Sequence, residues 1–332
     1  MPVRTPASVA VLLAVVLGAP AAAQPPAPPP LPASVKTVEI KSEAVGRTLK
    51  YNVVLPEKYD ESTDRYPVLY LLHGYSGNYN NWARMNAPKA AKENRLIVVM
   101  PDGGNSWYAN WAESTDGQKN AWDDFITKEL VKHVDSTYRT VASREGRAIN
   151  GLSMGGYGAL TLGLKHPDLY CSVGSESGAL GFARGVGERL RKGDDLAKTA
   201  AKRKLSDQPN AAIGIEGFSS QTERTPKGKL FATPEQADAY DPFKLVLTVP
   251  KEQMPHLVID CGTEDGLVKG AQEFVKLLME NKIPFTYSES AGGHNGAYWS
   301  REIGQAAAVQ AEILKRNLAK AAKDKETKSA NP

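Results

Sequence analysis

The chain has 332 residues, of which 41% are hydrophobic, 23% charged and 8% aromatic, and its formal net charge is +4 at pH 7. This composition is ordinary for a globular protein and excludes collagen-like, fibrous and wholly disordered chains. Residues 315–328 carry six lysines and arginines against two carboxylates, so the rest of the chain is nearly neutral. Such a distribution does not fit a nucleic-acid-binding surface, and we expect no nucleic acid partner.

The first 23 residues predict a secretory signal peptide. Arg4 precedes the apolar run 9–17, and small residues lead up to a cleavage site near Ala23 and Gln24. The run is well short of the roughly 20 apolar residues that span a bilayer. Proline-rich residues 24–34 then predict an extended linker. We therefore expect a secreted or periplasmic protein, with no membrane insertion after the signal is cleaved.

Strands alternate with helices beyond this linker. Alternating apolar and polar residues predict half-buried antiparallel strands at 35–40 and 49–55. Continuous apolar runs predict central parallel strands, covered on both faces, at 66–72, 96–100, 170–173 and 257–259. Apolar stripes at helical spacing lie at 122–138 and 267–278, and a late strand and a closing helix are expected at 283–287 and 299–318. The order predicts an α/β fold with a mostly parallel, doubly wound sheet and helices on both faces.

Two segments depart from this alternation. Residues 182–240 are Gly-rich and charged, without clear strand periodicity. A segment of that length is more typical of a functional lid or insertion than of a plain connection. Residues 319–332 predict a basic, disordered tail.

Metal, cofactor and disulfide sites are not expected. Cys171 and Cys261 are too few for a disulfide framework or a four-ligand zinc site, and the five histidines are scattered. No dinucleotide-binding or Walker A sequence occurs. The two cysteines lie at the start of one predicted strand and the end of another, so we expect free thiols.

A candidate nucleophile lies in the motif Gly151-Leu152-Ser153-Met154-Gly155. A G-x-S-x-G motif occurs by chance in roughly one chain in ten of this length, so the motif alone is weak. Here a short strand candidate at 147–150 precedes it and a helix at 155–165 follows. Strand, turn and helix with serine at the apex form a nucleophile elbow. The alternative is a Gly-rich helix start with an incidental serine.

A serine nucleophile needs a histidine base and a carboxylate that orients the base, in the chain order Ser, acid, His on a sheet of this type. His294 lies in a glycine loop after strand 283–287. His133 lies inside a predicted helix, His166 at a helix end, and His256 at the start of a strand, the opposite edge from the site. Asp265, in the turn after strand 257–261, is the favoured acid. Glu264 and Asp260 are alternatives, although Asp260 falls within the strand and suits a structural hydrogen bond better.

The oxyanion of such a reaction needs two backbone N–H donors. Met154 directly follows the nucleophile and supplies one. The second is assigned to Tyr75, in the loop after strand 66–72, where His73-Gly74 allows the backbone to turn an N–H inward. His73 is expected to shape this loop.

Several motifs occur in order along the chain. They are Leu71-Leu72-His73-Gly74 with Trp82, Pro101-Asp102-Gly103-Gly104-Asn105-Ser106-Trp107-Tyr108, Gly151-Leu152-Ser153-Met154-Gly155-Gly156, Cys261-Gly262-Thr263-Glu264-Asp265 and Gly293-His294. Together these motifs resemble the esterase D–type "putative esterase" family of α/β-hydrolases. The family includes tributyrin-type esterases, S-formylglutathione hydrolases, feruloyl and acetyl xylan esterases, and mycolyltransferases. The resemblance runs from about Val35 to Leu318, and Asn150 before the elbow is a departure from it.

The resemblance implies an α/β-hydrolase domain over residues 35–318 and a serine carboxylesterase that needs no cofactor. It also implies the triad Ser153, Asp265 and His294, with an oxyanion hole at Tyr75 and Met154. Three alternatives remain: an acyltransferase that uses the same triad with a sugar acceptor, a peptidase, and a non-catalytic carbohydrate-binding relative.

Aromatic residues near the expected site indicate the substrate class. Trp107, Tyr108 and Trp111 follow strand 96–100, at the sheet edge where ligands bind in open α/β folds. We expect Trp107 and Tyr108 to form an exposed wall of the cleft, and Trp299 to pack in the core. Aromatic walls favour flat acyl groups and sugar rings. The expected substrates are short acyl or hydroxycinnamoyl esters, including small-molecule and polysaccharide-linked esters, rather than long-chain triglycerides.

Overall fold

The structure is a computed structural model that describes residues 29–115, 117, 119–194 and 224–330. The expected signal peptide, the first part of the linker and the middle of the 182–240 insertion lie outside these residues. The described residues from Leu31 onward form one compact unit.

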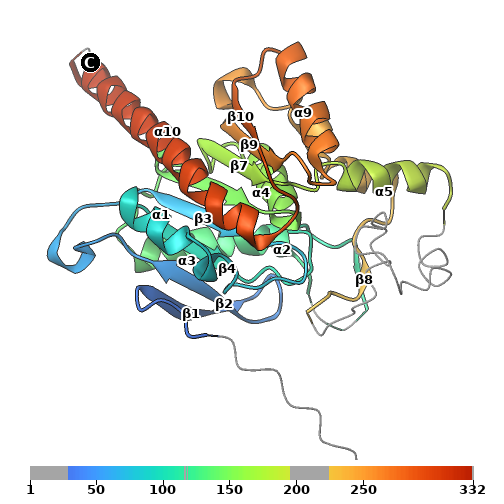
Figure 1. The fold of residues 1–332 in the computed structure, drawn as a ribbon, viewed down its shortest axis with the longest axis horizontal. Helices are drawn as coiled ribbons and strands as arrows, with labels where there is room; N and C mark the ends of the chain where they lie inside the picture. Colours follow the sequence, from blue (N-terminus) through green and yellow to red (C-terminus); the bar gives the residue numbers. More distant parts are fainter. Residues whose placement is uncertain (1–28, 116, 118, 195–223, 331–332) are drawn as a thin grey trace, which may run out of the picture. The chain divides into compact units, whose positions relative to one another are not determined.

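An eight-stranded sheet forms the centre of the described chain (Figure 1). Its strand order is β1-β2-β4-β3-β6-β7-β9-β10. Strands β1, β2 and β4 pair antiparallel, and the pairs from β4 through β3, β6, β7 and β9 to β10 are parallel. The strands are β1 (Val35–Ser42), β2 (Arg47–Val54), β3 (Val68–Leu72), β4 (Ile97–Pro101), β6 (Arg147–Gly151), β7 (Ser172–Glu176), β9 (His256–Gly262) and β10 (Phe285–Ser290).

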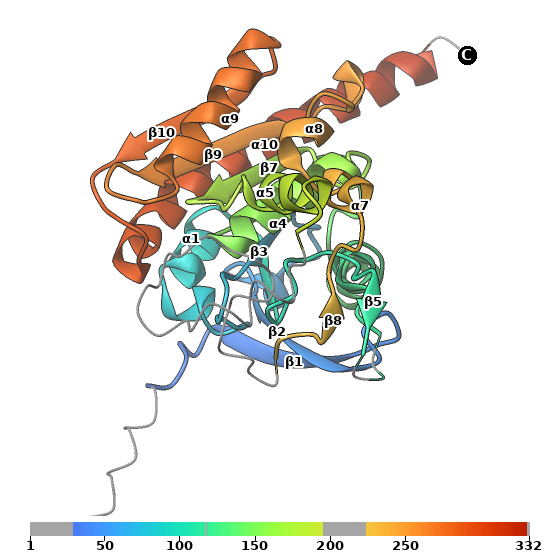
Figure 2. The same ribbon diagram turned by 90° about the vertical axis from the view of Figure 1, so that its right-hand side faces the viewer.

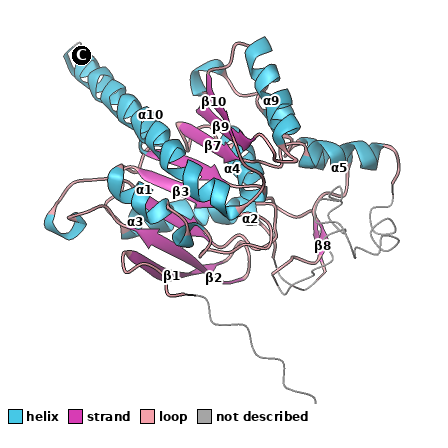
Figure 3. Ribbon diagram, viewed as in Figure 1, coloured by secondary structure: helices cyan, strands magenta, loops and turns pink. Residues whose placement is uncertain are grey.

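Helices cover both faces of this sheet (Figure 3). Helices α1 (Ala87–Glu93) and α10 (Gly296–Ala330) contact each other over one face. The other face is covered by a helical stretch, comprising α2 (Trp122–Asp124), a π-helical turn (Phe125–Leu130) and α3 (Val131–Thr137), and by α4 (Met154–Lys165) and α9 (Val268–Glu280). The expected α/β-hydrolase fold is therefore confirmed.

The apolar runs of the sequence follow from this two-sided burial. In β3, residues 68, 70 and 72 join the hydrophobic core on the α4 side, and residues 69 and 71 join the core on the α1 and α10 side. A strand covered on both faces favours apolar side chains at successive positions, which explains the apolar sequence of β3.

The described parts of the 182–240 insertion contact the connection that follows β4. They include α5 (Phe182–Arg191), β8 (Gly228–Lys229) and α7 (Pro234–Asp238), and α8 (Pro242–Leu245) follows. Strand β8 pairs antiparallel with β5 (Glu113–Ser114), which lies in the long connection after β4. The insertion is thereby attached to the connection that follows β4.

The C-terminal helix is longer than expected. Helix α10 continues to Ala330, so the expectation of disorder from residue 319 is wrong for 319–330. Alanine and lysine are strong helix formers, and they dominate this stretch. Figures 1 and 2 show the last turns of α10 extending past the sheet. No helix within the described ranges is long and apolar enough to cross a membrane.

Both cysteines are buried free thiols, as expected. In the register of β7 and β9, Ser172 pairs with His256 and Glu176 pairs with Asp260. Cys171 therefore precedes the first of these pairs and Cys261 follows the last, which separates them by about 20 Å along the strands.

We predict that thiol titration of the denatured, unreduced protein will detect two reactive groups per chain, because a disulfide requires Cα atoms within about 7 Å. A prior reduction step should leave this number unchanged. Detection of no thiol before reduction and two after it would contradict the strand register.

Candidate active site

The turn between β6 and α4 places Ser153 in a strained backbone conformation. Its φ is 54° and its ψ is −115°, values that non-glycine residues rarely adopt. The glycines that flank Ser153 in the motif, Gly151 and Gly155, are required because no Cβ atom fits at either position. A Cβ on Gly151 would lie 2.3 Å from the Gly155 carbonyl oxygen, and one on Gly155 would lie 2.2 Å from the Leu72 carbonyl oxygen. The serine therefore sits at the apex of a tight strand–turn–helix, as the motif predicts.

Ser153, His294 and Asp265 lie in a hydrogen-bonded series. His294 Nε2 is 2.9 Å from Ser153 Oγ, and His294 Nδ1 is 2.8 Å from Asp265 Oδ2. Because an ionised carboxylate can only accept, Nδ1 carries the proton and Nε2 is left to accept the serine hydroxyl proton. Asp265 is buried, whereas 31% of the His294 side chain is exposed, so the base can reach a substrate.

Asp265 is held in its ionised form. Burial alone would raise the pKa of Asp265, but hydrogen bonds from His294, the Leu267 N–H and the Ser177 hydroxyl lower that pKa below its usual value. The two alternative acids lie elsewhere. Glu264 is exposed and accepts a hydrogen bond from the Thr263 hydroxyl at 3.0 Å. Asp260 accepts one from the Tyr298 hydroxyl at 3.0 Å.

The two expected oxyanion donors lie beside the serine. Met154 is the first residue of α4, where a backbone N–H has no acceptor within the helix. Gly74 packs directly against the elbow, because a Cβ there would lie 3.3 Å from Ser153 Cβ and 2.6 Å from a methyl carbon of Leu152. The peptide that joins Gly74 to Tyr75 is therefore adjacent to the nucleophile.

His73 orients this peptide. Its Nε2 accepts a hydrogen bond from the Gly103 N–H at 2.9 Å, and its Nδ1 donates to the Gly74 carbonyl at 2.8 Å. The Gly77 N–H donates to the same carbonyl. In a trans peptide the N–H points opposite to the C=O. Fixing the Gly74 carbonyl therefore also fixes the direction of the Tyr75 N–H, so His73 shapes the loop as expected.

Family comparison agrees with this geometry. The family described as "Putative esterase" matches residues 42–308. The chain belongs to this esterase family.

Three relatives show the range of the family. An esterase of Mycobacterium tuberculosis is 27% identical over 270 residues, which cover 76% of this chain and 54% of that protein. An acetyl esterase of Caldicellulosiruptor saccharolyticus is 27% identical over 250 residues, covering 74% and 84%. A diacylglycerol acyltransferase/mycolyltransferase of Mycobacterium leprae is 34% identical over 164 residues, covering 47% and 48%. The match spans about half the length of both mycobacterial proteins.

Solved structures share the fold. An S-formylglutathione hydrolase from Staphylococcus aureus superposes with a TM-score of 0.63 at 22% identity, covering 83% of this chain and 98% of that one. A ferulic acid esterase superposes with a TM-score of 0.62 at 23% identity, covering 84% and 98%.

The prediction that Trp107 and Tyr108 form an exposed wall of the cleft is wrong. Trp107 is buried and stacks on Phe182, with ring centroids 3.4 Å apart and planes 4° apart. Tyr108 is fully buried, and its hydroxyl donates to the His73 carbonyl at 2.9 Å. Both residues have positive φ, a conformation that non-glycine residues rarely adopt. Trp111 is half-buried, and its Nε1 donates to the Ser106 carbonyl.

Trp299 differs from a simple core residue. It is half-buried against the core on the α1 and α10 side, as expected, but its ring also meets the His294 ring edge-on, with centroids 4.9 Å apart. The contact restricts the tilt of the imidazole. The only indication of this contact in the sequence is that Trp299 lies five residues after His294.

A buried acidic pair lies behind the nucleophile and was missed by sequence reasoning. Glu176 and Asp260 are register partners on β7 and β9, so their side chains lie side by side on one face. Asn150 Nδ2 donates to Glu176 Oε1 at 3.0 Å, and Asn150 Oδ1 accepts from the Gly151 N–H. The family departure at Asn150 therefore links the elbow to this pair. The signal available in the sequence was the polar run 175–177 at the end of a central strand.

The environment of the pair favours bound protons. Burial raises the pKa of Glu176 well above its usual range, and the Asp260 charge raises it further. Burial also raises the pKa of Asp260 to about 7, with a further contribution from Glu302 on α10. Hydrogen bonds donated by Asn150 to Glu176 and by Tyr298 to Asp260 lower these two pKa values, but by less than burial raises them.

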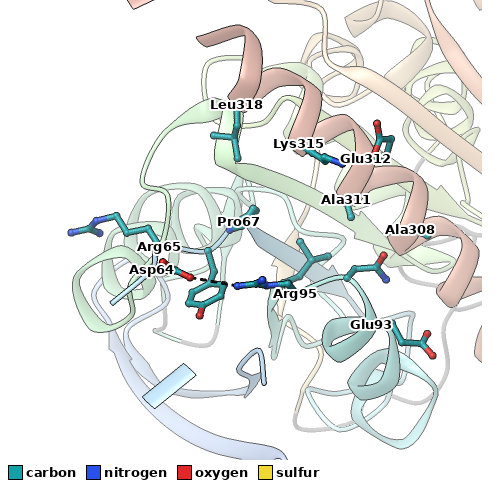
Figure 4. A pocket seen from close by; sticks show the side chains of 13 residues that line it. Asp64, Arg65, Pro67, Glu93, Arg95, Ala308, Ala311, Glu312, Lys315 and Leu318 are labelled. Carbon is teal, nitrogen blue, oxygen red and sulfur yellow. Dashed lines mark hydrogen bonds and ion pairs between the residues drawn. The ribbon is translucent and has the colours of Figure 1, made fainter. Parts of the chain in front are cut away.

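A separate groove lies at the opposite end of the sheet (Figure 4). It has a volume of about 640 Å³ and is bordered by residues that precede β3 and β4 and by α10. Its acidic and basic side chains balance, and Arg95 pairs with Asp64 at 3.4 Å. Because Ser153 follows the carboxyl end of β6, this groove takes no part in the candidate active site.

The acidic pair gives stability a definite pH dependence. From about pH 4 upward the folded chain holds protons that the unfolded chain has lost, so the free energy of unfolding falls as pH rises toward and beyond 7. Glu176→Gln removes one titrating group and keeps the oxygen that accepts from Asn150. We predict that its Tm at pH 8 will exceed that of the wild type by on the order of 2–4 °C, with a smaller difference at pH 5.

Glu264→Gln is the matched control, because Glu264 is exposed. Its Tm should follow that of the wild type at both pH values. A Glu176→Gln variant that is less stable than the wild type at pH 8 would contradict the protonated pair.

Proposed function

We propose that the protein is a serine carboxylic-ester hydrolase that acts through an acyl-enzyme, in a secreted or periplasmic location. The observation that carries this proposal is the hydrogen-bonded series from Asp265 through His294 to Ser153, beside the backbone of Met154 and Tyr75. The same arrangement argues against a non-catalytic carbohydrate-binding relative, because the triad is complete.

The geometry supports the following steps. His294 Nε2 takes the hydroxyl proton as Ser153 Oγ attacks the ester carbonyl, and Asp265 stabilises the imidazolium that forms. The N–H groups of Met154 and Tyr75 donate to the oxyanion of the tetrahedral intermediate. His294 then protonates the leaving alcohol. In the second half, water loses a proton to the same histidine and attacks the acyl-enzyme, which releases the acid and restores Ser153.

The proposed substrates are short acyl or hydroxycinnamoyl esters, including esters of carbohydrates. The acetyl esterase relative, which this chain matches over 84% of its length, supports a small acyl group. The ferulic acid esterase structure supports a hydroxycinnamoyl group. Because Trp107 and Tyr108 are buried, stacking on them does not support this substrate class.

Acyl transfer to a sugar hydroxyl is the second candidate. It is favoured by the 34% identity to the mycolyltransferase of Mycobacterium leprae. The triad chemistry is the same up to the acyl-enzyme, and the two functions differ only in whether water or a sugar hydroxyl attacks it.

We predict that Ser153→Ala will lower kcat for p-nitrophenyl acetate by at least about 10³-fold, because the acyl-enzyme can no longer form. The circular dichroism spectrum and Tm should remain close to those of the wild type. The wild type should be tested in parallel on p-nitrophenyl esters of increasing chain length, feruloyl esters and acetylated xylan, with and without a sugar acceptor.

Retained activity in Ser153→Ala would overturn the proposal. A preference for acyl chains of ten or more carbons would overturn the substrate class alone. Formation of an acylated sugar at the expense of the free acid would favour the transferase.

We also predict that Asp265→Asn will lower kcat by on the order of 10²–10⁴-fold, whereas Glu264→Gln will change it little. The amide introduced by Asp265→Asn would favour the wrong imidazole tautomer, because an amide can donate to Nδ1. Measurement of kcat and KM for both variants decides between the two acids, and the reverse ranking would assign the role to Glu264.

A further inference from the structure

Asn105 lies buried between residues 73–77, the oxyanion loop that follows β3 and carries Tyr75, and residues 224–229 of the 182–240 insertion. It belongs to the connection after β4 and is 2% exposed. Its Oδ1 accepts a hydrogen bond from the Ser76 N–H at 2.8 Å, and its Nδ2 donates to Thr225 Oγ1 at 2.8 Å. One side-chain amide thus connects two segments that are far apart in the sequence.

The hydrogen bond from the Ser76 N–H to Asn105 fixes the oxyanion loop on the C-terminal side of Tyr75. Tyr75 lies between two peptide groups. The preceding one is fixed through the Gly74 carbonyl, which accepts from His73 Nδ1 and from the Gly77 N–H. The following one carries the Ser76 N–H and is fixed by Asn105. Ser76 has a φ of 64°, a left-handed conformation that a serine does not favour without such a constraint. The placement of the Tyr75 N–H therefore depends on both anchors.

The insertion side of this connection is fixed by the backbone as well. The Asn105 N–H donates to the Arg224 carbonyl at 3.1 Å, and the Arg224 side chain pairs with Asp102. The fit at Gly104 is close, since a Cβ there would lie 2.7 Å from the Arg224 carbonyl oxygen. Farther along, the Thr115 N–H donates to the Lys227 carbonyl at 3.0 Å. Residues 224–229, which end in β8, therefore lie against the connection after β4.

We propose that Asn105 is a positioning residue that sets the Tyr75 N–H for the oxyanion and connects it to residues 224–229 of the insertion. The inference rests on the proposed function. Its consequence is that the insertion influences the rate of the chemical step through Asn105 and Thr225, in addition to any contact it makes with a substrate.

The test replaces the amide by an apolar group of similar volume. Asn105→Leu removes both side-chain hydrogen bonds, and we expect kcat for p-nitrophenyl acetate to fall about 10–100-fold while KM stays within about twofold. Complete loss of one oxyanion donor costs about 10²–10³-fold, and a displaced donor costs less. Inhibition by a trifluoromethyl ketone, whose adduct places an oxyanion in the same position, should weaken by a factor similar to the fall in kcat/KM.

The conservative variant separates positioning from packing. In Asn105→Asp the carboxylate still accepts from the Ser76 N–H, and the Thr225 hydroxyl can reverse its role and donate. We expect this variant to retain kcat within about fivefold of the wild type. Asn281→Leu is the matched control for the amide-to-leucine change, because Asn281 is exposed at the end of α9 and should leave kcat unchanged.

The link to the insertion is tested by a double-mutant cycle. Thr225→Val should lower kcat by a smaller factor than Asn105→Leu, because the Ser76 bond remains. Combining the two should produce no further loss, since residues that share one interaction are not additive. The proposal is overturned by a wild-type kcat in Asn105→Leu, by an Asp variant as impaired as the Leu variant, or by independent effects in the cycle. An active Ser153→Ala variant would instead overturn the proposed function itself.

Discussion

The hydrogen bond between His294 and Ser153 joins residues 141 positions apart in the chain. The arrangement of strands in the sheet brings these two residues together. Six strands from β4 to β10 run parallel, so their carboxyl ends meet along one edge. The segments carrying Tyr75, Asn105, Ser153, Asp265 and His294 each follow one of these strands. A change in the order or direction of a strand would separate His294 from Ser153.

The strands and turns at this edge of the sheet can largely be predicted from the sequence, because they depend on residues that are close together in the chain. Apolar runs mark strands that are covered on both faces, and the glycines at 151 and 155 mark a turn with no space for a Cβ. Chain order and the predicted end of the strand narrow the choice of acid to two adjacent positions, Glu264 and Asp265. Which of the two faces His294 depends on the conformation of a single turn, which the sequence does not define. The structure turns Asp265 toward His294 and leaves Glu264 exposed.

Other features depend on contacts that the sequence does not display. Trp107 and Tyr108 both adopt positive φ and are buried, and no residue preference predicts that conformation for two consecutive aromatic residues. The roles of Asn105 and Asn150 require knowledge of which distant segment lies opposite each amide. The acidic pair depends on strand register, because a shift by one residue would place Glu176 and Asp260 on opposite faces.

Helix α10 begins at Gly296, two residues after the histidine, and it spans the sheet to reach α1. Along its length, Gln310 donates to the Ile149 carbonyl on the strand that precedes the nucleophile. The element that closes one face of the core therefore also secures the base. During synthesis from the N-terminus, Ser153 is made long before His294 and α10, so the hydrogen bond between Ser153 and His294 can form only once this helix is available. The hydrophobic core on the α1 side and the pairing of Ser153 with His294 therefore both depend on the same late segment.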